Sequence, residues 1–452
     1  MVELTHIRVQ NVRCFEDSQL LDLRKLNLFI GANNSGKTAL LSSIELALRS
    51  TAGFGRAHGP LCFDLVDGFR SFDAVLRKQW TRVGKRPTNF VVECSWKFSE
   101  PDAATNGGGP GELFWGRFQC QDKFPSGEPV VSLAEFGLLP DRSQPLVRFT
   151  RQEPGLLTPQ EAVVYEGPLI PTDPGVYERR GDTVTFTGSF PNIWWFTQDA
   201  RLGVMVDLLG RVDPSLRARG SAPVRTIKPS RPDPRSVYVL DDPSLDEEQL
   251  DLLRTLLQLF APQNHKSDTV AAIRRNLQLL GLASNINVEK VQRSTGILAE
   301  IKVETPERYS RNPVTIADVG FGLSQVLPLV VREAGLHDSC LVAYEPETHL
   351  HPLAQSRLAD LFMASVGKGN RVFVETHSVY LILRLQTLIA RGEVDPKDVA
   401  VYCVEASDRK ATVTPMHFDE QGVPERTWPK NFLDTDFVLA RELAQERNLR
   451  RK

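Results

Sequence analysis

The sequence LFIGANNSGKTALL, residues 28–41, decides which fold this chain can adopt. It fits the spacing G-x-x-x-x-G-K-[ST] of a phosphate-binding loop, with the fixed positions at Gly31, Gly36, Lys37 and Thr38. Leu26–Ile30 before the loop is typical of a short buried strand, and Lys37–Arg49 after it has apolar residues at helical spacing. Strand, loop and helix in this order favour a true phosphate loop over a chance glycine-rich turn.

Such a loop can hold the phosphates of a nucleoside triphosphate. Its glycines let successive backbone N–H groups face the phosphates, and the following helix presents the positive end of its dipole to them. We expect the Lys37 ammonium to reach the β- and γ-phosphates and the Thr38 hydroxyl to ligate Mg²⁺. The predicted cofactors are therefore ATP and Mg²⁺, and the loop residues expected to contact them are Gly31, Asn33, Asn34, Ser35, Gly36, Lys37 and Thr38.

The composition is that of an ordinary globular protein. Of the 452 residues, 41% are hydrophobic and 24% charged, and no apolar run reaches the roughly 18 residues that would span a membrane. The six cysteines form no C-x-x-C pair, which favours reduced thiols in a cytoplasmic setting over a zinc site. The N-terminal residues lack a signal-peptide pattern. We therefore expect a cytoplasmic protein without membrane contact.

One segment carries local positive charge although the formal net charge is only −2. The stretch Arg211–Arg235 contains seven basic residues, only two acidic residues and five prolines, so it should be extended rather than helical. It could follow the backbone of a DNA strand, contact nucleotide phosphates, or be a solvated linker. The overall charge does not favour a dedicated nucleic-acid binder.

Three further motifs follow in the second half of the chain. Residues 318–328, DVGFGLSQVLP, precede a predicted helix at Val326–Ala334, and their serine and glycine N–H groups would form an anion site or a simple helix cap. The buried strand Cys340–Tyr344 runs into EPETHLHP, residues 345–352, which would place carboxylates beside Mg²⁺ and the attacking water. A third apolar strand, Arg371–Glu375, ends in Thr376-His377-Ser378.

These motifs together resemble those of ABC-type ATPases in the OLD/RecF-like branch. The resemblance is carried by Gly31–Thr38, Gly320–Gln325, Glu345–Pro352 and Glu375–Ser378. The sequence after Glu375 is similar to AAA-family ATPases of bacterial anti-phage defence operons, including the Septu (PtuA-like) ATPases. The start of the chain also resembles the ATPase heads of the SMC, RecF and OLD families, which would bring Arg13 near the nucleotide; a surface arginine in a turn is the alternative.

The resemblance implies a role for each motif. Gly322, Ser324 and Gln325 would contact the γ-phosphate of a nucleotide held by another subunit, so that ATP joins two heads. Glu345 would polarise the attacking water or ligate Mg²⁺, with Glu347 as the other candidate acid, and His377 would contact the γ-phosphate. The usual metal-binding aspartate of this strand is replaced by Tyr344. We therefore expect ATP binding, with hydrolysis slowed.

The resemblance also implies the fold: an α/β ABC-type P-loop ATPase head with a mixed central sheet flanked by helices. Strands are expected at Leu4–Asn11 and Phe90–Phe98, and short β-like runs between Leu113 and Phe190 indicate a β-rich insertion. Helices are expected at Asp246–Phe260 and Thr269–Leu280, followed by a hairpin over residues 286–304. The predicted parts are an N-terminal lobe at 1–75, the insertion at 76–225, a helical subdomain at 226–310 and a C-terminal lobe at 311–452.

Two absences shape the functional expectation. Neither predicted helix sustains heptads, so a long SMC-type coiled coil is not expected. The 48 residues after Val404 are too few for the Toprim nuclease domain of OLD proteins. We expect an ATPase that forms a homodimer or higher oligomer through its heads and controls a separate effector, a nuclease, in defence. The alternatives are a nucleotide-locked scaffold with little hydrolysis, and a RecF-like DNA-repair ATPase.

Overall fold

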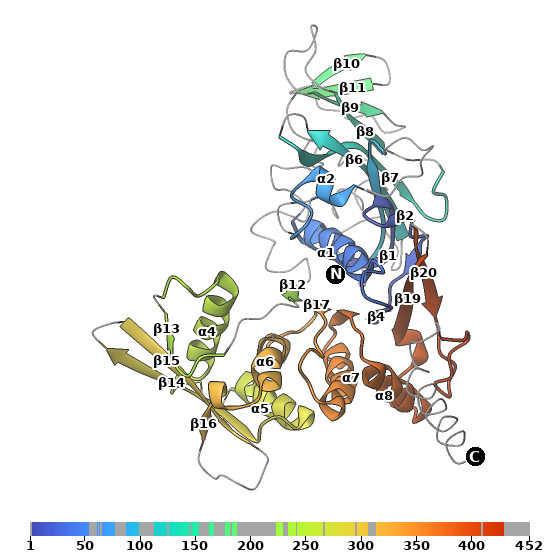
Figure 1. The fold of residues 1–452 in the computed structure, drawn as a ribbon. Coiled ribbons are helices and arrows are strands. Elements are labelled where there is room, and N and C mark those ends of the chain that lie inside the picture. Colours follow the sequence, from blue (N-terminus) through green and yellow to red (C-terminus); the bar gives the residue numbers. More distant parts are fainter. Residues whose placement is uncertain are drawn as a thin grey trace, which may run out of the picture. The chain divides into compact units, whose positions relative to one another are not determined.

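The computed structural model has a mixed α/β fold that divides into two compact units (Figure 1). The N-terminal unit contains residues 1–24, 32–224 and 404–415, and the C-terminal unit contains residues 25–31, 225–403 and 416–452. The division falls inside the phosphate loop, after Gly31. The structure describes residues 2–428 except 54–60, 62, 64–65, 77–86, 99–112, 124–125, 144, 146, 153–161, 167–176, 181–182, 188–222, 229–233, 241, 265–266, 294–295, 306–312 and 408–409.

The N-terminal unit is built on a large antiparallel sheet with the strand order β10-β11-β9-β8-β7-β6-β5-β1-β2, and β3 pairs with β1. Successive strands are mostly neighbours, as expected of antiparallel hairpins. Helix α1 (Lys37–Gly53) contacts β1, and a short helix, α2, covers Phe72–Val75. The strands are β1 (Val2–Val12), β2 (Phe15–Asp17), β3 (Leu21–Asp22), β5 (Phe90–Phe98), β6 (Leu113–Lys123), β7 (Glu128–Leu138), β8 (Val147–Gln152), β9 (Ala162–Glu166), β10 (Tyr177–Arg180) and β11 (Thr183–Thr187).

The two faces of this sheet differ in character. Along β5 the side chains of Phe90, Val92, Cys94 and Trp96 are buried on one face, as the two-residue period of a strand requires. On the other face, residues of opposite charge alternate from strand to strand in register: Arg8, Glu93, Arg117, Glu135 and Arg148. Ion pairs within this row connect neighbouring strands on that face, together with the buried ring of Trp115, over which the Arg117 guanidinium lies.

Glu93 is the most enclosed member of the charged row. Its carboxylate is 3% exposed and accepts hydrogen bonds from Arg142 at 2.5 Å and from Arg117 at 3.5 Å. Glu135 is similarly held by Arg148 at 2.6 Å and Arg117 at 3.4 Å. Buried carboxylates are tolerated only when they are paired in this way.

The C-terminal unit is organised on a second sheet, whose strand order is β12-β17-β18-β4-β19-β20. The central strands β17, β18, β4 and β19 are parallel and buried, as their continuous apolar sequences predicted. Helices α7 (Pro352–Gly367) and α8 (Val379–Ala390) pack together, and α7 also contacts β18 and β4. The strands are β12 (Val224–Ile227), β17 (Cys340–Tyr344), β18 (Arg371–Glu375), β4 (Leu26–Ile30), β19 (Val399–Ser407) and β20 (Lys410–Met416), the last of which lies largely in the segment counted with the N-terminal unit.

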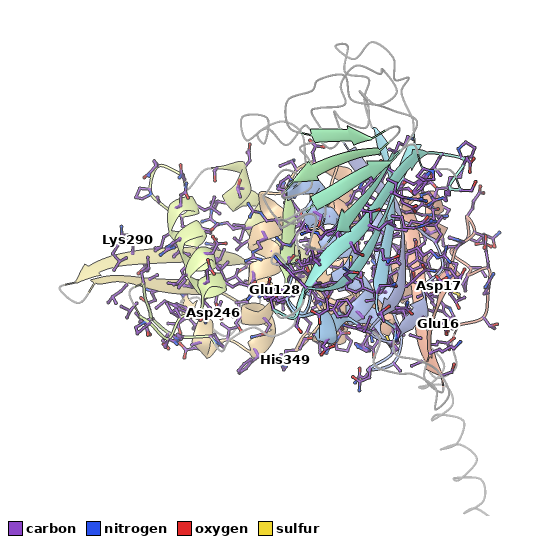
Figure 2. The ribbon with its side chains drawn as sticks, turned by 90° about the horizontal axis from the view of Figure 1, so that it is seen from above. Glu16, Asp17, Glu128, Asp246, Lys290 and His349 are labelled. Atoms are coloured by element: carbon purple, nitrogen blue, oxygen red, sulfur yellow. The ribbon has the colours of Figure 1, made fainter. Side chains whose placement is uncertain are left out.

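The rest of the C-terminal unit is a helical subdomain with a hairpin. Helix α4 (Glu247–Leu259) begins with a capping box in which Asp246, labelled in Figure 2, accepts from the N–H of Gln249. Helix α5 (Asp268–Leu280) ends at Gly281 in the left-handed conformation. The strands of this part are β13 (Tyr238–Val239), β14 (Asn285–Arg293), β15 (Gly296–Glu304) and β16 (Val314–Thr315).

Most predicted elements are confirmed with small shifts of their ends. The strands at Leu26–Ile30, Phe90–Phe98, Cys340–Tyr344 and Arg371–Glu375 have the predicted bounds. The β-rich insertion is present as β6 to β11, and β14 and β15 pair antiparallel as the predicted hairpin. Within the part of the chain that the structure describes, no helix is both long and apolar enough to cross a membrane. The predicted four-part division of the chain stays a prediction.

One predicted helix boundary was wrong. Helix α6 covers Phe321–Ala334, five residues earlier than the predicted start at Val326. Gly320 occupies the N-cap position, so Ser324 lies in the first turn of the helix and does not cap it. The glycines at positions 320 and 322 have a low intrinsic helix preference, but tertiary packing overrides that weak preference.

The packing that fixes the start of α6 involves Gly322. A Cβ atom at Gly322 would lie 2.8 Å from the backbone oxygen of His349, in the segment that follows β17. Next to it, the ring of Phe321 lies 5.8 Å from the ring of His349. Only a residue without a side chain allows this approach of α6 to the 345–351 segment.

We predict that Gly322→Ala lowers the free energy of unfolding by about 1–3 kcal/mol, because the added methyl group would overlap the His349 carbonyl. Gly320→Ala is the matched control, since a Cβ atom there meets no heavy atom within 4 Å. Chemical denaturation of both variants measures the difference. Equal stabilities would contradict the tight packing inferred for Gly322.

We also predict that Glu93→Ala destabilises the protein by about 3–5 kcal/mol, because the substitution leaves the partly buried Arg117 and Arg142 without their shared carboxylate. Glu128→Ala, at an exposed position of β7 labelled in Figure 2, should change the stability by less than about 0.5 kcal/mol. Urea unfolding monitored by circular dichroism compares the two. A loss at Glu93 as small as that at Glu128 would show that the charged row contributes little.

Candidate functional site

The phosphate loop has the backbone conformation that its sequence predicts. Gly31 and Gly36 have φ values of 146° and 113°, and Asn34 has a φ of 61°, so the loop uses conformations that favour glycine and asparagine. Within the N-terminal unit, a Cβ atom at Gly36 would lie 2.4 Å from Cys14 Sγ. Cys14, in the turn between β1 and β2, therefore packs directly against the loop and requires a glycine there.

Lys37 is the first residue of α1 and is only 3% exposed. Its ammonium donates a hydrogen bond to the carbonyl of Ala32 in the same loop at 2.8 Å. Ser35 is also buried, and its N–H donates to Ala32 at 3.3 Å. The lysine amine is thus held at the loop and at the positive end of α1, where phosphate oxygens would be bound.

Arg13 lies in the N-terminal unit with its guanidinium directed to the segment before α2. It donates to the carbonyl of Gly68 at 3.3 Å and lies 5.9 Å from the ring centre of Phe69. These contacts give Arg13 a structural role in its own unit. Its predicted contact with the nucleotide stays a prediction.

In the C-terminal unit, three parallel strands bring the remaining motifs to one edge of the sheet. Tyr344 at the end of β17 is in register with Glu375 at the end of β18, and Glu375 is in register with Phe29 of β4. Two backbone hydrogen bonds extend this alignment, from Glu345 N–H to Glu375 and from Thr376 N–H to Phe29. The acidic segment, the histidine segment and the start of the phosphate loop at Gly31 therefore share the carboxyl edge of the sheet.

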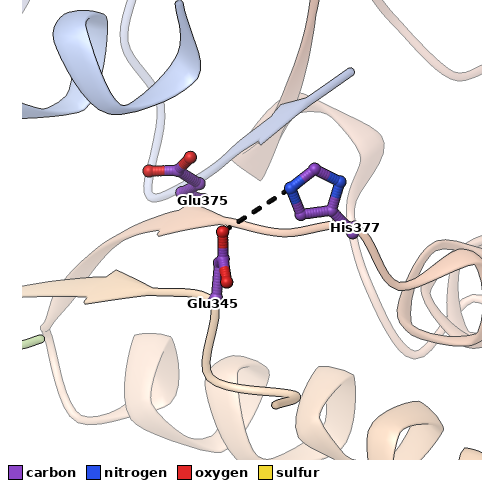
Figure 3. Close-up of side chains that lie close together, drawn as sticks. All are labelled: Glu345, Glu375 and His377. Atoms are coloured by element: carbon purple, nitrogen blue, oxygen red, sulfur yellow. Dashed lines mark ion pairs between the residues drawn. The ribbon is translucent and has the colours of Figure 1, made fainter. Parts of the chain in front are cut away.

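Glu345 and His377 contact each other at this edge. His377 Nε2 lies 3.6 Å from Glu345 Oε1, and both side chains are about one-third exposed (Figure 3). Glu345 has a φ of 43°, an uncommon value for a residue with a side chain. Strained backbone of this kind is frequent where a side chain must be aimed at a reaction centre. The edge therefore presents an acid and a histidine to solvent side by side.

Glu347 lies beneath this pair and is 7% exposed. Its Oε1 accepts a hydrogen bond from the backbone N–H of His377 at 2.6 Å. Burial raises the pKa of the Glu347 carboxyl, the hydrogen bond from His377 opposes the rise, and the charge of Glu345 adds to it. Glu347 therefore holds the backbone of the histidine segment in place.

The structure also brings Glu375 into the site, a residue for which we predicted no catalytic or metal-binding role. The ligand atoms of Glu345, Glu375 and His377 all lie within 4.8 Å of one another, close enough to bind one metal ion (Figure 3). Glu375 is 3% exposed, whereas the side chain of Glu345 is 39% exposed. The sequence shows an acid at the end of the strand RVFVE. Only the pairing of the strands shows that this acid lies near Glu345 and His377.

The two histidines of the EPETHLHP segment, His349 and His351, have structural contacts. The ring of His351 accepts a hydrogen bond from the Leu353 N–H and caps α7. His349, labelled in Figure 2, has a φ of 64° and lies against Phe321. Neither belongs to the metal-binding group found among the described residues.

The predicted signature residues lie at the start of α6 in the same unit. Ser324 donates its hydroxyl hydrogen to the carbonyl of Phe321 at 2.8 Å and remains partly exposed. Gln325 is 3% exposed and so faces the protein interior. Gly322 has a packing role against His349, which does not depend on a nucleotide. The γ-phosphate contacts expected of these residues stay predictions.

The family comparison matches two segments of the chain. Residues 3–83 and 250–382 match the model of the AAA ATPase domain family. The first segment contains the phosphate loop and the second contains α6, Glu345, Glu375 and His377. A search of the curated proteins found no match to the sequence.

Solved structures with a related arrangement are heads of SMC proteins, each 12% identical in sequence. An SMC head bound to the C-winged helix domain of ScpA gives a TM-score of 0.42 and covers 92% of this chain and 98% of its own. The SMC head domain from Thermotoga maritima gives 0.38, with 91% and 98% covered. The Smc head from Pyrococcus furiosus, with an extended coiled coil and bound to the C-terminal domain of ScpA, gives 0.42, with 98% and 100% covered.

The family match covers both segments that carry the predicted motifs, and the described residues place the acids and the histidine at the edge from which the phosphate loop begins. Over these two segments the chain therefore resembles the AAA ATPase domain family, within a mixed α/β fold.

Proposed function

We propose that this chain binds ATP and Mg²⁺ between two subunits arranged head to tail and hydrolyses ATP to control a separate effector protein. The observation that carries the enzymatic part is the Glu345–His377 pair at the carboxyl edge of the sheet that leads into the phosphate loop. A partly exposed carboxylate can polarise water, and a neighbouring histidine can contact the γ-phosphate.

The residues present fit ATP and Mg²⁺. Lys37 and the loop N–H groups would bind phosphate oxygens, and the Thr38 hydroxyl would ligate the metal. Glu345 would orient the attacking water, with Glu347 keeping the His377 backbone in place. The bound Mg²⁺ would neutralise charge that develops on the phosphates during transfer.

Dimerisation through the heads is supported by the start of α6. Phe321 is 48% exposed, Ser324 is partly exposed, and Gly320 offers no side-chain cap to the first N–H groups of the helix. Free N–H groups at a helix start favour an anion. We propose that this segment contacts the nucleotide of a second copy.

The biological part of the proposal is anti-phage defence with a nuclease as the effector. Its support is the sequence resemblance of the segment after Glu375 to ATPases of defence operons. A nucleotide-locked scaffold is the second candidate function, and the specific observation in its favour is Tyr344, which is 6% exposed where the usual metal acid would lie. A RecF-like role in DNA repair is the third reading.

A DNA contact through Arg211–Arg235 stays a prediction, because most of this segment lies outside the described residues. Of its basic residues, Arg225 and Lys228 are exposed. Arg235 pairs with Asp242 at 2.6 Å, so its charge is already compensated within the unit. Arg235 is therefore less available than the other basic residues of the segment to bind DNA phosphates.

We predict that Lys37→Ala weakens ATP binding at least about 100-fold, because the loop sequence would lose its one cation for the phosphates. Fluorescence titration with a labelled ATP analogue measures the affinity. Lys97→Ala, at an exposed position of β5, is the matched control and should bind ATP as the wild type does. Tight binding by the Lys37 variant would contradict the phosphate-loop assignment.

We predict that Glu345→Gln lowers ATP turnover about 100-fold or more while ATP binding and ATP-dependent dimerisation remain. Glu347→Gln should have a smaller effect, because an amide oxygen can still accept the hydrogen bond from His377. Phosphate release and light scattering measure turnover and dimerisation. Normal turnover in the Glu345 variant, with loss in the Glu347 variant, would transfer the water-activating role to Glu347.

A further inference from the structure

Position 344 poses a chemical problem for the proposed function. Mg²⁺ is bound in proteins by one or two carboxylates together with waters and phosphate oxygens. Tyr344 offers a neutral phenol at the end of β17 and is 6% exposed. A phenol with an ordinary pKa of about 10 is not a suitable ligand for Mg²⁺ near neutral pH. The metal therefore needs a carboxylate from another position.

The strand register identifies that position. Tyr344 and Glu375 are direct neighbours on the parallel strands β17 and β18. Residues in register on neighbouring strands project to the same face of a sheet. In the strand order β17-β18-β4, Glu375 is also one strand nearer to β4, which leads into the phosphate loop. Its carboxylate belongs to the same face and edge as a side chain at position 344.

The surroundings of Glu375 suit a cation. Carboxylate oxygens of Glu345 and Glu375 and a ring nitrogen of His377 lie within 4.8 Å of one another (Figure 3). A third carboxylate, that of Glu347, is more than nine-tenths buried and accepts a hydrogen bond from the backbone N–H of His377. Three acids gathered at one partly buried edge repel one another unless a cation lies among them.

The exposure of the two acids in this group separates their roles. Glu345 is 39% exposed at its side chain and contacts His377, which suits a group that acts on a water molecule. Glu375 is 3% exposed, and burial favours a carboxylate that binds a metal ion over one that must exchange with solvent. Glu347 is engaged by the His377 N–H and holds the backbone.

We propose that Glu375 replaces the missing aspartate of β17 as the carboxylate that ligates Mg²⁺ in this ATPase. The proposal rests on the proposed nucleotide site and adds to it the residue that gives the site its metal. It also explains how a chain with tyrosine at position 344 keeps a magnesium-dependent nucleotide site.

The test is the metal dependence of nucleotide binding, which does not require turnover. Binding of a non-hydrolysable ATP analogue is measured with Mg²⁺ and with EDTA. We expect Mg²⁺ to tighten binding by the wild type, and Glu375→Gln to lose this enhancement by roughly tenfold or more while binding in EDTA is unchanged. Glu393→Gln, at an exposed position of the same unit and outside the group of three, is the matched control and should keep the full enhancement.

Metal binding can also be observed directly. Mn²⁺ in place of Mg²⁺ gives a paramagnetic resonance signal whose loss reports binding. With the analogue present, the wild type should bind one Mn²⁺ tightly and Glu375→Gln should bind it no better than the free analogue does. The double variant Tyr344→Asp/Glu375→Gln has a carboxylate at the neighbouring position on β17 in place of the one on β18. We expect it to bind Mn²⁺ again. A purely structural role of Glu375 would not predict this recovery.

The outcomes separate the two proposals. A wild type that binds no nucleotide would overturn both the proposed function and the role of Glu375. Nucleotide binding with the same Mg²⁺ enhancement in wild type and Glu375→Gln would overturn the role of Glu375 alone. If thermal melting shows that Glu375→Gln is unfolded, Glu375→Asp is measured instead. Aspartate keeps the negative charge, but its side chain is shorter by one methylene group. Glu375→Asp should therefore weaken Mn²⁺ binding several-fold. Unchanged Mn²⁺ affinity would contradict direct ligation by Glu375.

Discussion

The alignment of three parallel strands is the constraint on which the candidate site depends. The register of β17, β18 and β4 places Tyr344, Glu375 and Phe29 side by side. The acidic segment, the histidine segment and the phosphate loop therefore all begin at one edge of the sheet. Parallel strands cannot be joined by tight turns, and the connecting segments are long. The site is therefore assembled from segments that are separate in sequence, with β4 near the start of the chain and β17 and β18 in its last third. The backbone hydrogen bonds from Glu345 to Glu375 and from Thr376 to Phe29 maintain their alignment.

At that edge, buried and exposed side chains have different roles. Glu347 is enclosed and holds the histidine segment through its backbone, while Glu345 and His377 remain accessible. Gly322 lets α6 approach the His349 backbone, so that the start of α6 is fixed against the segment that carries the acids. A nucleotide that contacted α6, as we propose, would therefore also affect the segment that carries Glu345.

Much of the fold could be predicted because buried parallel strands have continuous apolar sequences and amphipathic helices have a clear period. Leu26–Ile30, Cys340–Tyr344 and Arg371–Glu375 were recognisable for this reason. The start of α6 was not, because two glycines with low helix preference precede Val326 and tertiary contacts stabilise the helix there. Register is also invisible in one sequence. Strand pairing and register alone show that Tyr344 and Glu375 are neighbours. The same is true of the alternating charges on the first sheet, which include Glu93 and Arg117.

The central claim is that this edge and the phosphate loop form a working nucleotide site. The most direct measurement is release of phosphate from ATP by the purified wild-type protein, in Mg²⁺ and then in excess EDTA, with bound nucleotide quantified in parallel. The account predicts that ATP is bound and phosphate is released, slowly but measurably, only with the metal present. A protein that binds no ATP in either condition would contradict it.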